Sequence, residues 1–85
     1  MMRLWGRKSS INVLKVLWCL AELDLHEGIH FERTDAGLQF GIVRSPEFLK
    51  LNPNGLVPTL EDGDIVLWES NTILRYLASQ HDKNK

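Results

Sequence analysis

The sequence predicts one small α/β domain whose strands and helices follow each other in the order βαβαββα. Two stretches carry apolar residues at helical spacing, and several short runs are apolar or alternate in the manner of strands. An Asp-Gly pair between two such runs indicates a hairpin. The chain has 85 residues, and a chain of this size buries only about 60–65% of its unfolded surface, so a thin core is expected.

A short strand at Leu4 and Trp5 is predicted to open the fold, and a helix over residues 11–25 follows it. Ser9 and Ser10 stand where the N-cap of that helix belongs. The helix prediction rests on apolar side chains at helical spacing, namely Leu14, Trp18, Ala21 and Leu25, with Val13, Leu17 and Leu20 widening the face.

In the middle of the chain, the sequence predicts a strand, an irregular stretch and a short helix. Residues 29–33 alternate apolar and polar side chains, whereas residues 35–45 contain two glycines and have no clear period. Ser45-Pro46-Glu47 is typical of a helix start, with a capping serine and a proline at the first helical position. This helix is expected to run to about Leu51 and to stop before Pro53.

The last third predicts a hairpin and a final helix. Residues 57–60 and 65–68 are the two strands, and residues 61–64 between them contain the Asp-Gly turn. Ser70 opens a helix, which the polar run over residues 81–85 ends. The apolar positions of this helix are Ile73, Leu74, Leu77 and Ala78.

Composition argues against several kinds of partner. Apolar residues make up 44% and charged residues 25% of the chain, and the net charge is -1 with the basic residues scattered. We therefore expect neither nucleic acid nor a membrane as a partner. The single cysteine, Cys19, lies in an apolar run, and no Cys/His cluster has metal-ligand spacing, so no metal is expected. Without a signal peptide or a long apolar run, a cytoplasmic location follows by default.

Asn52 to Asn71 is the stretch that most strongly predicts a small-ligand site. Pro58 removes a hydrogen-bond donor from a predicted strand, so it belongs at an edge, a strand start or a functional kink. With a cis bond before it, the backbone of Val57 would face outward and could pair with an extended peptide. An ordinary edge proline is the competing interpretation.

Two strand-to-helix junctions suit the charged and reactive groups of such a ligand. A serine N-cap at Ser70 would leave helix N–H groups for a carboxylate, and Glu69 would suit an ammonium group. At Ser9 and Ser10, a hydroxyl and the helix dipole could stabilise a ligand thiolate. Plain helix capping is the alternative at both junctions. Hydrolase chemistry is disfavoured because neither serine has a histidine and a carboxylate at triad-like positions.

Four segments together carry a family resemblance: residues 10–15 (SINVLK), 46–53 (PEFLKLNP), 57–60 (VPTL) and 67–77 (LWESNTILRYL). They resemble the thioredoxin-like N-terminal domain of cytosolic glutathione transferases, of a bacterial serine type similar to the theta and beta classes. The likeness runs from about Leu4 to His81. It implies a mixed four-stranded sheet with helices on both faces, and one glutathione-binding domain over residues 1–85.

The resemblance also implies roles for the residues of the ligand site. Pro58 would be a cis-proline, and the backbone of Val57 would pair with the cysteinyl part of glutathione. Glu69 and Ser70 would hold the γ-glutamyl end, with Asn71 as a further glutathione-binding residue. Ser10 would stabilise the thiolate, and Ser9 and Asn12 are the fallback candidates for that role.

By resemblance the function is activation of the glutathione thiol for attack on hydrophobic electrophiles. The family supplies the electrophile pocket from a second, all-helical domain, and the chain stops at Lys85, so we expect that domain to be absent and leave enzymatic activity open. The wide apolar faces of both long helices then predict a homo-oligomer. The alternative is a truncated, non-catalytic interaction module. A thiol-disulfide oxidoreductase is disfavoured because Cys19 falls in mid-helix.

Overall fold

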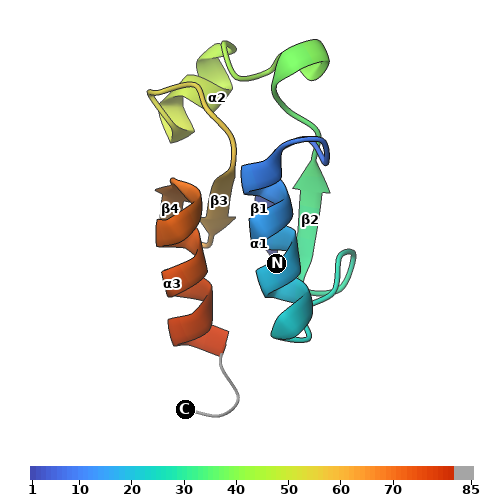
Figure 1. Ribbon diagram of the computed structural model, residues 1–85. Coiled ribbons are helices and arrows are strands. Elements are labelled where there is room, and N and C mark those ends of the chain that lie inside the picture. The colour runs from blue at the N-terminus through green and yellow to red at the C-terminus, as the bar shows by residue number, and fades with distance from the viewer. Residues whose placement is uncertain (82–85) are drawn as a thin grey trace.

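The computed structural model describes residues 1–81 and has a four-stranded sheet at its centre (Figure 1). The strands are β1 (Met2–Trp5), β2 (Phe31–Thr34), β3 (Thr59–Asp62) and β4 (Ile65–Trp68), and they lie in the order β2-β1-β3-β4. β1 and β2 are parallel, whereas β3 is antiparallel to both β1 and β4. The predicted element order and the mixed sheet are therefore confirmed.

Helices cover both faces of the sheet, though unequally. The helices α1 (Ile11–Glu22) and α3 (Ser70–His81) lie side by side on one face (Figure 1). The shorter α2 (Pro46–Leu51) meets the other face at one end, where Phe48 contacts the Trp5 ring edge-on with the ring centroids 5.7 Å apart. Ser45 caps α2 as predicted, because its hydroxyl accepts a hydrogen bond from the amide of Phe48.

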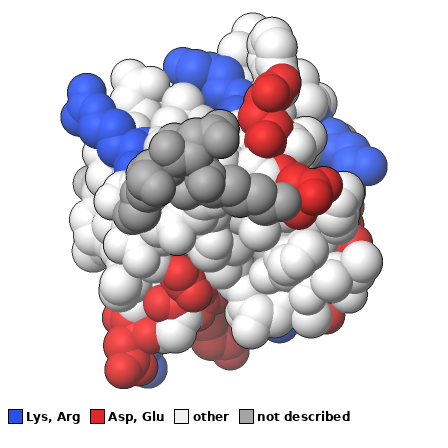
Figure 2. Space-filling model, turned by 90° about the horizontal axis from the view of Figure 1, so that it is seen from below, with Lys and Arg blue, Asp and Glu red and all other residues white. Residues whose placement is uncertain are grey.

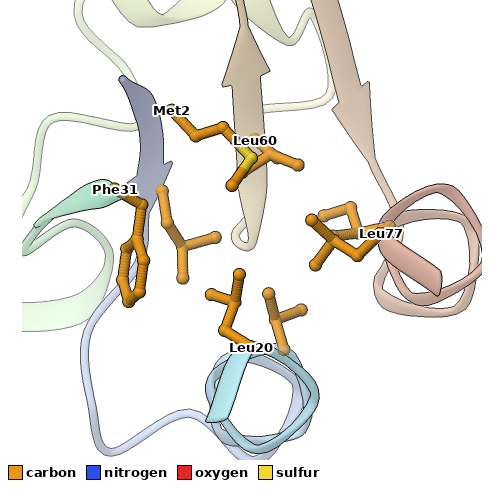
Figure 3. Packing of buried hydrophobic residues seen from close by; sticks show 8 residues of the cluster. Met2, Leu20, Phe31, Leu60 and Leu77 are labelled. Atoms are coloured by element: carbon orange, nitrogen blue, oxygen red, sulfur yellow. The ribbon is translucent and has the colours of Figure 1, made fainter. Parts of the chain in front are cut away.

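The core lies between the sheet and the pair α1 and α3. Side chains alternate across a strand, so Met2 and Leu4 of β1 face the helices while Trp5 faces α2. Figure 3 shows strand and helix side chains pointing toward one another in this layer. Its eight buried members are Met2, Leu4, Val16, Leu20, Phe31, Leu60, Ile73 and Leu77. Burying each of the larger ones stabilises the fold by about 1.5–3 kcal/mol.

The first helix is three residues shorter than predicted. It ends at Glu22, and the chain leaves it through Asp24, which has a φ of 61°. The amide of Leu25 bonds to the carbonyl of Leu20 (2.9 Å), and the amide of Asp24 bonds to that of Ala21 (3.0 Å). This is a Schellman motif without glycine. Leu25 still packs on the core, so its apolar character gave no signal that the helix had ended.

The second strand begins two residues later than predicted. Ile29 is exposed and belongs to a turn rather than to β2. The turn is closed by His26, whose amide donates to Nδ1 of His30 (2.9 Å). The alternation of apolar and polar residues that begins at Ile29 therefore does not mark the start of the strand.

The remaining expectations differ only in their boundaries. β3 begins at Thr59 rather than at residue 57 and extends to Asp62, so Gly63 and Asp64 form the turn. Residues 35–45 are irregular as predicted, apart from the 3-10 turn η1 (Leu38–Phe40). The last helix ends at His81, and residues 82–85 of the predicted polar run lie outside the described residues.

Gly6 connects β1 to α1 at a point with no room for a side chain. A Cβ at this position would lie 2.4 Å from Cγ2 of Val13, which is fully buried in α1. The first turn of α1 is therefore held directly against the end of β1.

We expect Gly6→Ala to lower the free energy of unfolding by about 1–3 kcal/mol, because the methyl group must displace Val13. Urea unfolding measures this. Gly28→Ala is the matched control, because no atom lies within 4 Å of its added Cβ and only backbone strain is tested. In a Val13→Ala background, Gly6→Ala should lower the free energy of unfolding by less. An equal loss in both backgrounds would contradict the steric explanation.

Tyr76 ties α3 to the end of β3. Its hydroxyl donates a hydrogen bond to Oδ2 of Asp62, and this bond, with burial and the charge of Asp62, raises the pKa of Tyr76 to about 12. Tyr76 is the only tyrosine of the chain, so its titration can be followed by tyrosinate absorbance.

We expect the bond to contribute stability fully below about pH 10 and to lose that contribution as the pH rises to about 12, because the folded pKa is raised. In Tyr76→Phe this alkaline loss should disappear, and at neutral pH the variant should lose about 0.5–1.5 kcal/mol. Urea unfolding across this pH range measures both effects. An ordinary tyrosine pKa in the folded protein would contradict the interaction.

Candidate functional site

Two adjoining cavities lie at the end of the sheet where α1 and α3 begin. The first cavity has a volume of about 340 Å³ and is lined by Asn12, Asn52, Asn54, Leu56, Val57, Pro58, Trp68, Glu69 and Ser70. The second has a volume of about 330 Å³ and is lined by Arg7, Ser10, Asn12, Gly37, Leu38, Val43, Gly55, Leu56 and Val57. They share Asn12, Leu56 and Val57, so a ligand lying along Val57 would reach both.

The loop before β3 is held in place from inside by Asn52, which is fully buried. Its Nδ2 donates to the carbonyl of Leu56 (3.0 Å) and to Oγ1 of Thr59 (3.1 Å), and its Oδ1 accepts from the amide of Asn54 (3.0 Å). The sequence analysis placed Asn52 at the start of the ligand-site stretch and did not predict this role. An asparagine directly after a helix and before a proline was the available signal.

Val57 presents an unpaired stretch of backbone to both cavities. β3 begins only at Thr59, and within residues 1–81 neither the amide nor the carbonyl of Val57 forms a hydrogen bond. The Val57–Pro58 peptide bond is cis, which is the form that the resemblance implies. An extended ligand can therefore add its own backbone hydrogen bonds along this edge.

The start of α3 differs from the prediction, because Glu69 and not Ser70 is the N-cap. The carbonyl of Glu69 accepts from the amide of Ile73 (3.1 Å), and its Oε1 accepts from the amide of Thr72 (3.3 Å). Ser70 is the first residue of the helix and is only 4% exposed, and its hydroxyl donates to Oδ1 of Asn12 (3.4 Å). Serine is the commoner cap, but Glu69 adopts a left-handed φ of 77° that turns its carboxylate toward the helix N–H groups.

The candidates for thiolate stabilisation have unequal positions. Ser10 is 8% exposed, lines the second cavity and accepts the amide of Val13 at 3.3 Å, which makes it the N-cap of α1. Capping uses a lone pair and leaves its O–H to donate. Asn12 lines both cavities, whereas Ser9 is exposed and lines neither. Asn71 is likewise exposed and is not among the lining residues.

Among the lining residues without a predicted role are Trp68, Asn54 and Arg7. Trp68 and Asn54 line the first cavity, and Arg7 lines the second. No pattern in the sequence around Arg7 distinguishes it from its neighbour Lys8. Only the folded loop brings its side chain to the cavity.

A third hollow lies away from these cavities, between α1 and α3. It has a volume of about 440 Å³ and is lined by Lys15, Trp18, Cys19, Glu22, Leu74 and Ala78. Trp18 is 70% and Leu14 48% exposed, so part of the wide apolar face of α1 is exposed. Cys19 packs against the core, and burial raises the pKa of its thiol. This thiol is therefore a weak nucleophile, remote from the ligand cavities.

Seen from the end where α1 and α3 finish, acidic and basic side chains are intermixed (Figure 2). Within residues 1–81, no three or more His, Cys, Asp or Glu side chains are grouped to hold a metal ion. None of the helices in this part of the chain has the length and apolar character to cross a membrane.

Comparison with known proteins gives one consistent result. The family model described as "Glutathione S-transferase, N-terminal domain" matches residues 1–79. Glutathione S-transferase GstB of Escherichia coli is 51% identical over 87 residues, covering 100% of this chain and 40% of its own length. Glutathione S-transferase 3 of Zea mays is 42% identical over 80 residues, covering 94% of this chain and 34% of its own length.

Solved structures agree in fold. The theta class glutathione S-transferase of Xanthomonas axonopodis pv. citri, solved with glutathione bound, is 48% identical with a TM-score of 0.86, covering 94% of this chain and 37% of that one. A glutathione transferase of Phanerochaete chrysosporium in complex with oxidized glutathione is 38% identical with a TM-score of 0.85, covering 99% and 38%. The chain thus spans well under half the length of these proteins. Sequence and fold agree over nearly all of its residues, and the chain belongs to the glutathione S-transferase N-terminal domain family.

Proposed function

We propose that this chain binds glutathione across the two cavities and activates its thiol, as the glutathione-binding domain of a glutathione transferase. The observation that carries the proposal is the unpaired backbone of Val57, which borders both cavities. The Xanthomonas relative supports it, because that structure holds glutathione and is 48% identical to this chain.

The proposed orientation follows from the chemistry of the two cavities. The γ-glutamyl end lies in the first cavity, where Glu69 supplies an acidic group for the ammonium. The hydroxyl of Ser70 turns from Oδ1 of Asn12 to donate to the carboxylate. The cysteinyl unit pairs with the backbone of Val57. Asn71 remains a proposed contact of the γ-glutamyl end, although its exposed position makes it a peripheral one.

Activation rests on Ser10 and the start of α1. The hydroxyl of Ser10 donates a hydrogen bond to the glutathione sulfur, and the N-terminal dipole of the 12-residue helix favours negative charge nearby. The thiol gives its proton to solvent, and the thiolate lone pair forms a C–S bond to an electrophilic carbon as the bond to a leaving group breaks. Asn12, which lines both cavities, is the fallback donor, and Ser9 is the weaker one.

The partners of the whole protein belong to the same proposal. We infer a hydrophobic electrophile, bound where a second domain supplies the pocket, and a cytoplasmic setting. Self-association stays a prediction, supported by the exposed apolar surface around Trp18. The same surface favours the second candidate function, a non-catalytic interaction module.

We expect Ser10→Ala to raise the pKa of the bound glutathione thiol by about one to two units, because a hydrogen bond to a charged acceptor contributes about 1.5–3 kcal/mol. Thiolate absorbance of the complex as a function of pH measures the shift. Ser10→Ala also removes a helix cap, which costs about 1 kcal/mol of stability.

The matched control for the lost cap is Ser45→Ala. Ser45 caps α2 with the same geometry, accepting the amide of Phe48 at 3.2 Å, and lines neither cavity. Both variants should lose stability, and only Ser10→Ala should change the thiol pKa. An unchanged thiol pKa in Ser10→Ala would remove Ser10 from the mechanism, and no heat with millimolar glutathione would end the binding proposal.

We expect Glu69→Gln to weaken glutathione binding about fivefold, since an exposed charge pair contributes about 1 kcal/mol. The glutamine oxygen can still cap α3, so stability should change little. Calorimetry compares glutathione with an analogue that lacks the α-amino group, and Glu47→Gln in the first turn of α2 is the control. Equal weakening of both ligands would show that Glu69 does not contact the ammonium.

A further inference from the structure

β4 is an edge strand without a charged side chain. The strand order β2-β1-β3-β4 leaves one side of β4 without a neighbouring strand among the described residues (Figure 1). The sequence of β4 is IVLW, and its first and last side chains are exposed. Proteins usually protect an edge strand with charges, proline or a bulge, because an unprotected edge pairs with another strand. β4 has no charge and no proline, and its continuous register with β3 leaves no bulge.

The opposite edge of the sheet is protected in this usual way. β2 carries Glu32 and Arg33 at its centre. Oε2 of Glu32 lies 3.6 Å from Nη2 of Arg3, and Nη1 of Arg33 bonds to the carboxylate of Asp35. A strand added beside β2 would have to pass these charged groups. The two edges therefore differ, and β4 is the one open to strand addition.

The register of the hairpin shows which backbone groups of β4 are unpaired. Asp62 and Ile65 face each other across the two-residue turn, and such a turn closes on a hydrogen-bonded pair. Hydrogen-bonded pairs alternate along an antiparallel ladder, so Ile65 and Leu67 bond to β3. The amides and carbonyls of Val66 and Trp68 therefore point away from β3. A strand that lies beside β4 can bond to these groups.

A hollow lies along this edge. It has a volume of about 350 Å³ and is lined by Val66, Leu67, Trp68, Glu69 and Thr72. Val66 and Leu67 point to opposite faces of the sheet, so a hollow bordered by both lies at the edge and not on one face. Thr72 borders it from the first turn of α3. An apolar side chain of an added strand can therefore be buried there.

Acidic side chains stand at both ends of β4. Asp64 precedes the strand in the hairpin turn, Glu69 follows it, and both are exposed. No ion pair in residues 1–81 involves either carboxylate. The two positions are five residues apart, which corresponds to about 17 Å along a strand. A partner strand that carries basic residues at this spacing would meet both carboxylates.

The same charges disfavour a second copy of the chain as the partner. In a symmetric antiparallel pair centred on Val66 or on Leu67, Asp64 lies within one residue of Glu69 of the second copy. The symmetry repeats this approach at the other end of the pair. Like charges that face each other across a ladder destabilise it. Charge complementarity therefore favours a basic peptide over self-pairing.

We propose that the β4 edge binds an extended peptide segment whose apolar centre is flanked by basic residues. The segment adds a fifth strand to the sheet, and its backbone bonds to Val66 and Trp68. Its basic residues lie beside Asp64 and Glu69, and one apolar side chain enters the hollow. Because both ends of β4 are acidic, the charge pattern fits either strand direction. This binding does not require glutathione.

The probe is the hexapeptide acetyl-Lys-Val-Thr-Val-Thr-Lys-amide, whose lysines have the spacing of Asp64 and Glu69. Calorimetry measures its binding to the 85-residue chain without glutathione. Two forms, N-methylated at the third or the fourth residue, test the strand pairing. Neighbouring amides of a strand point to opposite sides, so one form should bind about tenfold more weakly and the other should bind normally. Equal binding of both forms, or no binding of the unmodified peptide at millimolar concentration, would overturn the proposal.

Charge reversal tests the flanking contacts. Asp64→Lys should weaken binding of the peptide about fivefold, because an attractive pair becomes a repulsive one. A glutamate at one end of the peptide should restore binding to this variant, and the end that does so gives the strand direction. Glu27→Lys is the matched control, because it makes the same charge change at an exposed site next to β2. Equal weakening by both variants, or no restoration by either peptide, would contradict the proposed charge contacts.

Amide hydrogen exchange distinguishes the peptide from a second copy. The peptide should slow exchange at Val66 and Trp68, whereas Ile65 and Leu67, which already bond to β3, should change little. Without the peptide, exchange at Val66 and Trp68 should not depend on the concentration of the chain. Protection that rises with that concentration would assign the edge to a second copy and overturn the proposal.

Discussion

The direction of three strands decides where the chemistry of this chain can be. β3 is antiparallel to both β1 and β4, so β1 and β4 run the same way and the helices that follow them both begin at one end of the sheet (Figure 1). β3 starts at that same end. The N-terminus of α1, the unpaired Val57 and the N-terminus of α3 therefore meet without any long loop, and the hydrogen bond from Ser70 to Asn12 joins the two helix starts. Both helices pack on the same core, which holds their N-termini side by side.

Helix capping and the proposed ligand contacts use the same side chains at Ser10 and Glu69. Each side chain accepts an amide proton of the helix that it opens, and each lines a cavity. A hydroxyl can cap and donate at once, and a carboxylate has a second oxygen for a ligand. Functional side chains that also cap helices are held in one position before a ligand arrives, which lowers the ordering cost of binding. Asn52 likewise holds the loop before β3 in one position. Its side-chain amide forms hydrogen bonds with the backbone of Leu56 and Asn54, close to Val57.

Local signals in the sequence predicted most of the fold and several of the residues that line the two cavities. Helical spacing, the Ser45-Pro46 start and the Asp-Gly turn each act within a few residues, so the element order was correct. The end of α1 was missed because Leu25 packs on the core from a Schellman turn as well as it would from a helix. The cap of α3 was missed because a left-handed Glu69 follows from its surroundings and not from glutamate itself. The side chain of Arg7 lies in space that Gly37, 30 residues away, leaves free, and no local pattern predicts that contact.

The left-handed backbone of Glu69 has a consequence for engineering. A non-glycine residue at a φ of 77° carries a conformational penalty of about 1 kcal/mol or more, so any stability-guided redesign would mark this position for glycine. Glycine is also an acceptable N-cap, and the exchange would look favourable by melting temperature alone. The same exchange would delete the acidic group that faces the first cavity. Under the proposed function, stability and ligand recognition therefore favour different residues at this position, and a variant stabilised by glycine here would lose the proposed contact to the ligand ammonium.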